Sequence, residues 1–311
     1  MRQIIETIAR ATVMAVAFLG ASAAVAASPL GPARTSAILV DADSSRILYS
    51  RGAEQIGHPA SITKVMTLFL AFDALAEGRL SLTDRIVMTR HAASMSPSKL
   101  GLAPGQSLSV EDAIRVIAVK SANDVAVAVA ERLGGNETNF ARMMTNKARS
   151  LGMVQTNFAN ATGLPNPANF TSARDLALLS MGILRAHPDR YRYFGQRYFT
   201  YGQQTMTNHN RLLGIVPGVD GIKTGYTVDS GFTLAASATR GGRRLIAIVL
   251  GEPSAAIRNR TVTGLLEAGF TALQRRAMGQ EVDIAALLPG SMASVPTPIP
   301  ARIAPTAVGS D

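Results

Sequence analysis

The sequence of 311 residues contains no cysteine. This absence excludes a disulfide framework, a thiolate metal site and a cysteine nucleophile. Histidine is scarce as well, and the four histidines form neither an H-E-x-x-H pair nor a close cluster with aspartate. We therefore expect the protein to bind no metal and to need no other cofactor.

Long hydrophobic runs are missing beyond the N-terminus, where no stretch of eighteen uninterrupted apolar residues occurs, so we predict no internal membrane span. Long charge blocks are missing too. With 47% hydrophobic and 17% charged residues, such a chain is expected to bury a core rather than stay disordered. Its length suffices for one large domain, alone or with a small appendage.

The N-terminus has the features of a secretory signal. Arg2 and Arg10 give it a basic start, residues 11–26 are apolar and rich in small side chains, and Ala24-Val25-Ala26 matches an A-x-A cleavage pattern. We predict that residues 1–26 are a signal peptide, removed on export. An uncleaved membrane anchor is the alternative.

Lysine is rare among the basic residues, with only five in the chain, although the formal net charge is +10. A basic surface suits an anionic polymer or a membrane surface. Nucleic acid is the usual alternative partner, but the predicted export argues against it. A solvated basic face explains most of the arginines, whereas two of the lysines belong to motifs described below.

The hydrophobic pattern predicts strands near both ends of the chain and helices between them. A hairpin is expected over 36–50. Helices are expected over 62–75, 108–133, 136–151, 172–186 and 255–278, and strands over 219–226, 231–238 and 244–251. This order predicts an α+β fold, with helices packed on an antiparallel β-sheet, rather than a parallel βαβ series.

The end of the chain changes in composition after Met278. Five prolines fall in a short and weakly charged segment. We predict that residues 279–311 are a disordered tail or a spacer, and that the folded domain covers 27–278.

Ser61-Ile62-Thr63-Lys64 is the first of three motifs that could carry chemistry. A serine and a lysine three residues apart on a helix share one face, so the amine of Lys64 can reach the hydroxyl of Ser61. A hydroxyl attacks an amide poorly unless a base takes its proton. A lysine acts as that base only if burial or another cation lowers its pKa, and the apolar residues after Lys64 favour burial.

This spacing alone is a weak signal, because Ser61 could equally be a helix cap. The chain also contains a second match, Ser96-Pro97-Ser98-Lys99. It lies in a stretch flanked by proline and glycine, with no apolar helix after it, and we predict that it is a loop.

Ser121-Ala122-Asn123 is the second motif and the only S-x-N triplet in the chain. It follows an apolar stripe with helical spacing, and polar groups placed there are unfavourable unless they find partners. The hydroxyl could relay a proton, and the amide could hold a substrate carbonyl. The alternative is a helix end with capping residues.

Lys223-Thr224-Gly225 is the third motif and lies in a predicted strand. Gly225 removes the side chain where the backbone of a ligand would approach, and an extended substrate could add alongside such a strand. Lys223 and Thr224 would offer a cation and a hydroxyl to a carboxylate. An ordinary edge strand guarded by a charged residue is the alternative.

In this order, the three motifs match the set found in penicillin-recognising serine enzymes. From about residue 37 to residue 269 the chain resembles the serine-type D-alanyl-D-alanine carboxypeptidases, the low-molecular-mass penicillin-binding proteins. The similar segments are 58–67, 119–126, 161–165, 172–177 and 218–227. The resemblance implies a β-lactamase/transpeptidase-like three-layer sandwich with a helical subdomain.

The resemblance implies catalytic roles for three residues. Ser61 would be the acylated nucleophile, Lys64 the general base, and Ser121 a group that passes the proton to the leaving D-alanine. The substrate implied is a peptidoglycan peptide stem ending in D-Ala-D-Ala, met after export to the periplasm. β-Lactam antibiotics would acylate Ser61 as substrate mimics.

The resemblance also implies a binding role for the remaining motif residues. Asn123 would hold the penultimate peptide group, while Lys223 and Thr224 would face the terminal carboxylate. Beyond Gly225, the backbone N–H of Tyr226 would form an oxyanion hole with that of the nucleophile.

Two departures from the family pattern stand out. Many members carry arginine at the second place of an N-R-N-x-L-L stretch, where this chain has His209. We expect carboxylate binding there to be weaker or pH-dependent, unless His209 is only a surface histidine. The segment after Met278 is also too short for the second β-rich domain of other members and lacks a basic amphipathic pattern, which leaves membrane association open.

Three alternatives remain from the sequence. A class A β-lactamase shares the motifs but needs a glutamate that activates the deacylating water, and no glutamate occurs between Asn139 and Ile222. A D,D-endopeptidase cutting peptidoglycan crosslinks uses the same acyl-enzyme chemistry, and sequence barely separates it. A non-catalytic wall-binding protein is disfavoured because all three motifs are intact.

Overall fold

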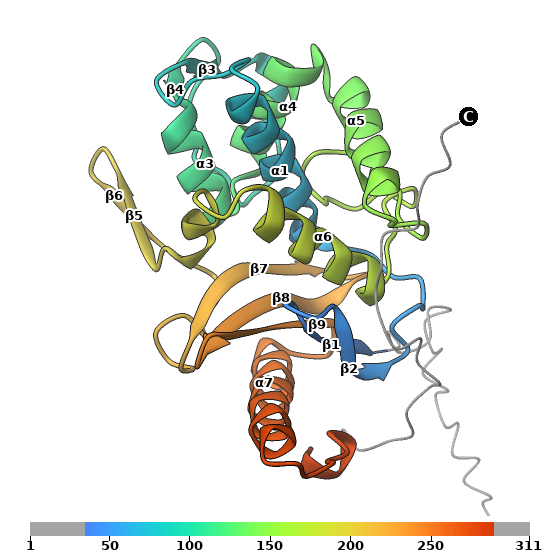
Figure 1. Cartoon of the computed structure of the whole chain (residues 1–311). Helices are drawn as coiled ribbons and strands as arrows, with labels where there is room; N and C mark the ends of the chain where they lie inside the picture. The colour runs from blue at the N-terminus through green and yellow to red at the C-terminus, as the bar shows by residue number, and fades with distance from the viewer. Residues whose placement is uncertain (1–34, 289–311) are drawn as a thin grey trace, which may run out of the picture. The chain divides into compact units, whose positions relative to one another are not determined.

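The computed structural model describes residues 35–288, which are built around a five-stranded antiparallel sheet. The strand order is β2-β1-β9-β8-β7 (Figure 1). These strands are β1 Ser36–Asp41, β2 Arg46–Arg51, β7 Val219–Thr227, β8 Gly231–Arg240 and β9 Arg243–Glu252. The N-terminal hairpin therefore pairs with the last strand of a C-terminal meander, and β7 forms one edge of the sheet.

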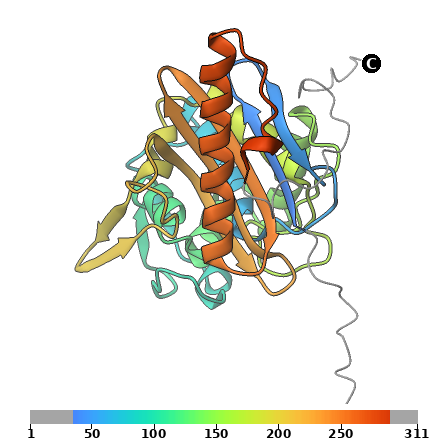
Figure 2. The same ribbon diagram turned by 90° about the horizontal axis from the view of Figure 1, so that it is seen from below.

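Helices cover both faces of this sheet. Helix α7 lies alone across one face (Figure 2), and α1 and α6 lie on the other face (Figure 1). The helices are α1 Thr63–Ala76, α2 Arg90–Ser94, α3 Val110–Val119, α4 Asn123–Gly134, α5 Glu137–Ser150, α6 Ala173–Ala186 and α7 Ala255–Ala277. This arrangement confirms the predicted α+β architecture of a sheet between helical layers.

Two short two-stranded sheets complete the helical side. Strand β3 (Arg85–Val87) pairs with β4 (Ser107–Ser109), and β5 (Tyr198–Tyr201) pairs with β6 (Gln204–Thr207). The β5–β6 hairpin projects away from the helices (Figure 1). None of these four strands is predicted from the sequence, because segments of three or four residues are too short to show a hydrophobic period.

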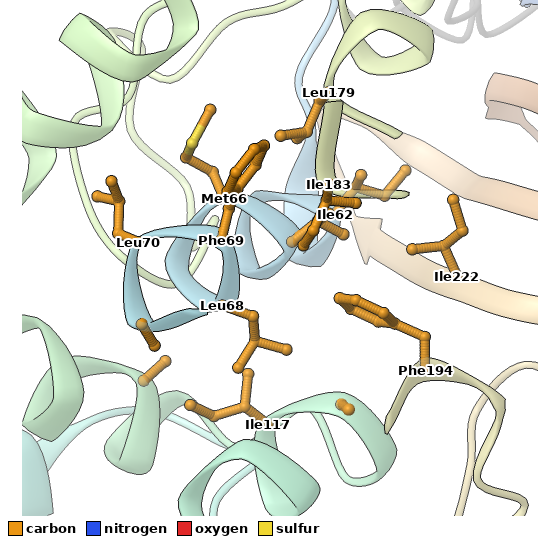
Figure 3. Packing of buried hydrophobic residues seen from close by; sticks show 14 of the residues in the cluster. Ile62, Met66, Leu68, Phe69, Leu70, Ile117, Leu179, Ile183, Phe194 and Ile222 are labelled. Carbon is orange, nitrogen blue, oxygen red and sulfur yellow. The ribbon is translucent and has the colours of Figure 1, made fainter. Parts of the chain in front are cut away.

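Helix α1 lies at the centre of the larger core. Its side chains point in several directions, with Met66 and Phe69 on one side and Leu68 facing Ile117 of α3 on another (Figure 3). A helix that is apolar all round is buried all round, and every residue from Thr63 to Phe72 is buried. The start of α1 is therefore fixed by packing.

The single helical segment expected over 108–133 is two helices. Helix α3 ends at Val119 and α4 begins at Asn123. Between them, Ser121 has a φ of 63°, a left-handed conformation that an α-helix cannot contain. The other predicted strands and long helices are confirmed to within two residues at each end.

The folded chain continues past the boundary expected at Met278. A 3₁₀ turn, Ala285–Leu287, packs beside α7, and Ile284 and Leu288 are buried in the smaller core on that face. Residues 279–288, the first ten of the expected tail, are therefore part of the fold, because Ile284 and Leu288 pack in the core between α7 and the sheet. The predicted signal peptide (1–26) and the rest of the tail (289–311) lie outside the described residues.

Across residues 35–288, none of the helices combines the length and the apolar character needed to span a bilayer.

Truncation of Ile284 tests the extended boundary. Ile284→Ala removes a side chain that is 1% exposed, and we expect it to lower the free energy of unfolding by about 2–4 kcal/mol, as for other large-to-small core changes. Ile215→Ala is the matched control, since Ile215 is 72% exposed and should change stability by less than about 0.5 kcal/mol. Urea unfolding gives both values, and equal effects would place Ile284 outside the core.

Candidate active site

Ser61 and Lys64 are in direct contact. A 3₁₀ turn, Ala60–Ile62, precedes α1, so Ser61 lies just before the helix and Lys64 lies in its first turn. The amine of Lys64 donates to the hydroxyl of Ser61 over 3.0 Å. Ser61 is half-buried, whereas Lys64 is completely buried. The geometry predicted from the three-residue spacing is therefore present.

The amine of Lys64 is held by a loop that follows α5. It donates to the carbonyl of Thr162 over 2.7 Å. The side chain of Asn160 accepts from the N–H of Gly163 over 2.7 Å and shapes the loop. Gly163 has a φ of 77°, and an added Cβ would collide with the carbonyl of Ala60, so only glycine lets the loop close on the turn that carries Ser61.

Burial lowers the pKa of the Lys64 amine well below its ordinary value. The positive charge of Lys223 lowers this pKa further, and the carboxylate of Asp124 opposes both effects. Desolvation disfavours the charged ammonium. A neutral amine next to a hydroxyl is the arrangement that proton abstraction requires.

Ser121 occupies the break between α3 and α4. Its hydroxyl is buried and has no hydrogen-bond partner among residues 35–288. A non-glycine residue in the left-handed region raises the free energy of the folded state by about 1–3 kcal/mol. A buried hydroxyl without a partner adds a separate penalty. The fold thus holds an unpaired hydroxyl in a strained position, which leaves it free to interact with a ligand.

Asn123 and Asp124 attach a neighbouring loop to the start of α4. The side-chain amide of Asn123 donates to the carbonyl of Ser96 over 2.9 Å. The buried carboxylate of Asp124 accepts from the N–H groups of Leu100 and Gly101, over 3.0 and 2.8 Å. Asp124 therefore fixes the loop and also acts electrostatically on the amine in α1.

This loop contains the second serine–lysine match, and its non-helical conformation confirms the loop prediction. The amine of Lys99 donates to the carbonyl of Ala93, outside the motif, over 3.4 Å. Asp124 is not among the site residues predicted from the sequence. Its place directly after the S-x-N triplet was the available signal.

The third motif lies on β7, at the edge of the sheet. Lys223 and Thr224 are both buried, and the Lys223 amine donates to the carbonyl of Thr224 over 3.3 Å. Burial, together with the smaller effect of the Arg258 guanidinium, lowers the pKa of Lys223 to about 7. Arg258, from α7, was missed by the sequence analysis because no local pattern separates it from the other arginines.

Gly225 lets β7 touch the turn that carries Ser61. An added Cβ at Gly225 would lie 2.9 Å from the Cβ of Ala60 and 3.0 Å from the backbone nitrogen of Ser61. Such contacts are too close for a side chain. The backbone of Tyr226, the next residue, therefore begins beside the nucleophile turn, as the oxyanion-hole prediction requires.

His209 lies between two buried asparagines that anchor its loop. Asn208 donates to the carbonyl of Gln196 over 2.9 Å, and Asn210 donates to the carbonyl of Gly221 over 3.0 Å. Partial desolvation lowers the pKa of His209, and the nearby positive charges, that of Lys223 first among them, act in the same direction. The imidazole is exposed, so water screens part of this effect, and the ring favours its neutral form.

The two glutamates nearest the second motif already have partners. Glu137 accepts from the N–H of Ala161 over 3.0 Å and pairs with His91 at 3.1 Å. Glu131 accepts from the hydroxyl of Thr89 over 2.7 Å. In the part of the chain that the structure describes, no group of three histidine, aspartate or glutamate side chains could hold a metal ion.

The depressed pKa of Lys223 makes stability depend on pH. The folded pKa lies near 7 and the ordinary value is 10.5, so the unfolded chain binds the proton more tightly and the folded state gains stability as pH rises between these values. We expect Lys223→Met to be the more stable protein near pH 7, and its advantage to shrink by on the order of 1 kcal/mol for each pH unit up to about pH 10.

Urea unfolding of both proteins at pH 6 to 10 measures this difference. Lys99→Met, at a half-exposed position, controls for the loss of one positive charge. An advantage of Lys223→Met that stays constant from pH 7 to pH 10 would contradict the burial of a cation at this position.

A family profile described as D-alanyl-D-alanine carboxypeptidase, peptidase family S11, matches residues 23–254. The curated relatives include DacF of Bacillus subtilis, 36% identical over 250 residues, and DacC of Escherichia coli, 36% identical over 240 residues. Both carry the name D-alanyl-D-alanine carboxypeptidase. These alignments cover 78% and 75% of this chain but 64% and 60% of the two relatives, so the chain spans less than two thirds of their length.

Solved structures give the same assignment. Penicillin-binding protein 5 of Haemophilus influenzae is 34% identical with a TM-score of 0.74, covering 79% of this chain and 73% of that one. Penicillin-binding protein D2 of Listeria monocytogenes, in its ampicillin-bound form, is 31% identical with a TM-score of 0.70, covering 76% of this chain and 96% of that one. The expected penicillin-binding-protein fold is confirmed, and the chain belongs to the D-alanyl-D-alanine carboxypeptidase family, peptidase family S11.

Proposed function

We propose that the protein is a serine-type D-alanyl-D-alanine carboxypeptidase that removes the terminal D-alanine from peptidoglycan stems. One observation carries the proposal: a completely buried amine, that of Lys64, lies 3.0 Å from the hydroxyl of Ser61. Burial and a second lysine both favour its neutral form. The family and the bound ampicillin of the Listeria relative support the same chemistry.

Acylation begins when the neutral amine of Lys64 accepts the proton of Ser61. The serine oxygen forms a bond to the carbonyl carbon of the penultimate D-alanine. The backbone N–H groups of Ser61 and Tyr226 stabilise the negative charge on the carbonyl oxygen, and such preorganised donors are worth about 2.7–4 kcal/mol each. The C–N bond then breaks, and the proton passes to the leaving amine through the hydroxyl of Ser121.

Deacylation reverses these roles with water as the nucleophile. The water oxygen forms a bond to the ester carbonyl carbon while the neutral amine of Lys64 accepts a proton from the water. The bond to the serine oxygen then breaks, and Lys64 returns the proton to that oxygen, which restores Ser61. The products are free D-alanine and a stem shorter by one residue. A β-lactam follows the first step only, because its leaving group stays attached to the acyl-enzyme.

The end of the site formed by Lys223 and Thr224 suits the terminal carboxylate of the substrate. Lys223 has a pKa of about 7 and is deeply buried, so an arriving carboxylate would favour its protonated form. Thr224 supplies a hydroxyl beside it. His209 stands where many family members have arginine, and the neutral imidazole offers a hydrogen bond in place of a permanent charge. Asn123 would hold the penultimate peptide group from the opposite wall.

Export and cell-wall location belong to the same proposal. The features of a cleaved signal in residues 1–26 support passage across the membrane, and the substrate proposed here lies in the periplasm. We also propose that the catalytic domain begins after this signal, while its C-terminal end includes the packed segment up to Leu288.

Removal of either reacting group tests the acyl-enzyme mechanism. We expect Ser61→Ala to abolish both labelling by benzylpenicillin and release of D-alanine from a pentapeptide. We expect Lys64→Ala to reduce both by about 10³-fold or more, because nucleophile and base act as a unit. Mass spectrometry of the penicillin adduct should locate the modification on Ser61.

The second serine–lysine match provides the matched controls. Ser96→Ala and Lys99→Ala remove the same groups from the loop, and the carbonyl of Ser96 that holds Asn123 is unchanged by substitution of its side chain. Both should retain near-wild-type activity. Near-wild-type D-alanine release by Ser61→Ala would contradict the mechanism, and release of monomers from crosslinked dimers instead of D-alanine would indicate an endopeptidase.

Two substitutions of Ser121 separate its hydroxyl from its backbone. Ser121→Ala leaves a Cβ at a φ of 63°, whereas Ser121→Gly adopts this φ without strain. We expect each variant to lose about 10²–10⁴-fold in the rate of D-alanine release, since each removes the proton relay. Circular dichroism should show Ser121→Gly folded. If Ser121→Gly works at the wild-type rate, the residue only shapes the helix break.

A further inference from the structure

The segment between Asp189 and Asp220 contains no carboxylate, although the whole chain has 21 acidic residues. Residues 190–219 include four arginines and four of the six tyrosines of the chain. They form a 3₁₀ turn, Tyr191–Gly195, the β5–β6 hairpin and the loop that leads to β7. Positive charge and aromatic rings are therefore concentrated where the hairpin projects from the helices (Figure 1).

The carboxylates that border this segment do not offset its charge. Glu111 of α3, which packs against β5, pairs with Arg115. Asp220, at the start of β7, pairs with Arg244 over 2.7 Å. Asp189 is exposed, and the 3₁₀ turn separates it along the chain from the hairpin. The surface beside the hairpin therefore carries a net positive charge.

Arg197 connects the hairpin to the loop that follows it. Its backbone carbonyl accepts from the N–H of Asn208 over 2.8 Å. Its guanidinium lies 5.5 Å from the centre of the Tyr198 ring. It also lies against the loop, since a Cβ added to Gly214 would be 2.8 Å from the guanidinium carbon. The hairpin and the loop thus form one continuous surface.

The hairpin has one buried and one open face. Phe199 is opposite Met206 in the register, and both pack against the larger core. The neighbouring pair, Tyr198 and Thr207, points to the other face, because side chains alternate along a strand. Both of these residues are exposed. The ring of Tyr198 therefore lies on the open face, away from the core.

Two large apolar side chains and two cations share this surface. Tyr198 is 57% exposed and Ile215 is 72% exposed, whereas Leu212 of the same loop is buried in the smaller core. Arg197 and Arg211 are exposed, and neither has an ion-pair partner among residues 35–288. Exposed apolar groups that lie together mark interaction surfaces, and the cations indicate an anionic partner.

We propose that Arg197, Tyr198, Arg211 and Ile215 form a docking surface for an anionic phospholipid membrane. The guanidinium groups are attracted to the lipid phosphates. The tyrosine ring suits the headgroup level, and the isoleucine side chain enters the acyl boundary. A soluble polyanion would engage the arginines but leave Ile215 in water, so the apolar half of the surface favours the lipid. Because none of these residues belongs to the three motifs, docking is independent of the proposed function.

Vesicle sedimentation tests the lipid partner. The probes are sucrose-loaded vesicles of phosphatidylglycerol and phosphatidylcholine in equal amounts, compared with vesicles of phosphatidylcholine alone. The protein is isolated after export, and all variants share its terminal segments. We expect binding to the anionic vesicles at low salt and binding to the neutral vesicles that is about tenfold or more weaker. Binding should be lost in 1 M NaCl, where the Debye length is about 3 Å.

Paired substitutions assign the binding to the surface. Replacement of both Arg197 and Arg211 by glutamine should weaken binding to the anionic vesicles by about tenfold to thirtyfold, since each arginine contributes about fivefold. Arg142→Gln combined with Arg260→Gln is the matched control, because it removes two exposed arginines from α5 and α7 and should bind as the wild-type protein does. Ile215→Ser should also weaken vesicle binding. Benzylpenicillin labelling should be unchanged in every variant.

A single fluorescent reporter shows which side chain enters the lipid. The chain contains no tryptophan, so Tyr198→Trp supplies the only indole emission. We expect this emission to shift to shorter wavelength when anionic vesicles are added, as the ring leaves water. Val87→Trp, at a position on β3 that is 52% exposed, is the control and should show no shift.

Three results would overturn the proposal. The first is an equal loss of vesicle binding in the two double arginine variants, which would reduce the effect to the charge of the whole protein. The second is wild-type vesicle binding by Ile215→Ser together with an unshifted Tyr198→Trp emission, which would exclude the lipid. The third is equal binding to neutral and anionic vesicles. If dextran sulfate alone distinguishes the wild-type protein from the Arg197 and Arg211 double variant, the surface binds a soluble polyanion instead.

Discussion

The burial of one amine governs the rest of this site. Lys64 can act as a base only if the fold makes its charged form unfavourable, and the structure does so by enclosing it completely beside a second buried lysine. Two buried lysines oppose stability. The hydrogen bond to Thr162 and the carboxylate of Asp124 limit that penalty. The apolar core around α1 stabilises the fold and offsets the unfavourable burial of the two lysines (Figure 3).

The site is assembled at a junction of three independent pieces. The turn before α1 carries the nucleophile, the break between α3 and α4 carries Ser121, and the edge strand β7 carries the lysine of the third motif. Glycines at 163 and 225 let the pieces touch where any side chain would hold them apart. The close approach of these backbone segments therefore sets the geometry of the reacting groups.

The sequence predicted the features that depend on neighbours along the chain. The three-residue spacing of Ser61 and Lys64 and the strand pattern of β7 are local, and both were correct. Thr162 and Arg258 act through contacts between distant segments, and no short pattern encodes these contacts. Asp124 also contacts a distant segment, and its only local signal is its place directly after the S-x-N triplet. The end of the domain was placed too early because the proline-rich composition concealed the burial of Ile284 and Leu288.

The pairing of the first strand with the last determines when the sheet can form during synthesis of the chain. Ser36 of β1 is opposite Leu250 of β9 in the register, so the central sheet is incomplete until nearly the whole domain has been synthesised. Contacts between such distant residues form late, since the chain must first close a very long loop. An emerging chain therefore has no assembled nucleophile, and reactivity arises only once the C-terminal strands have joined the N-terminal hairpin.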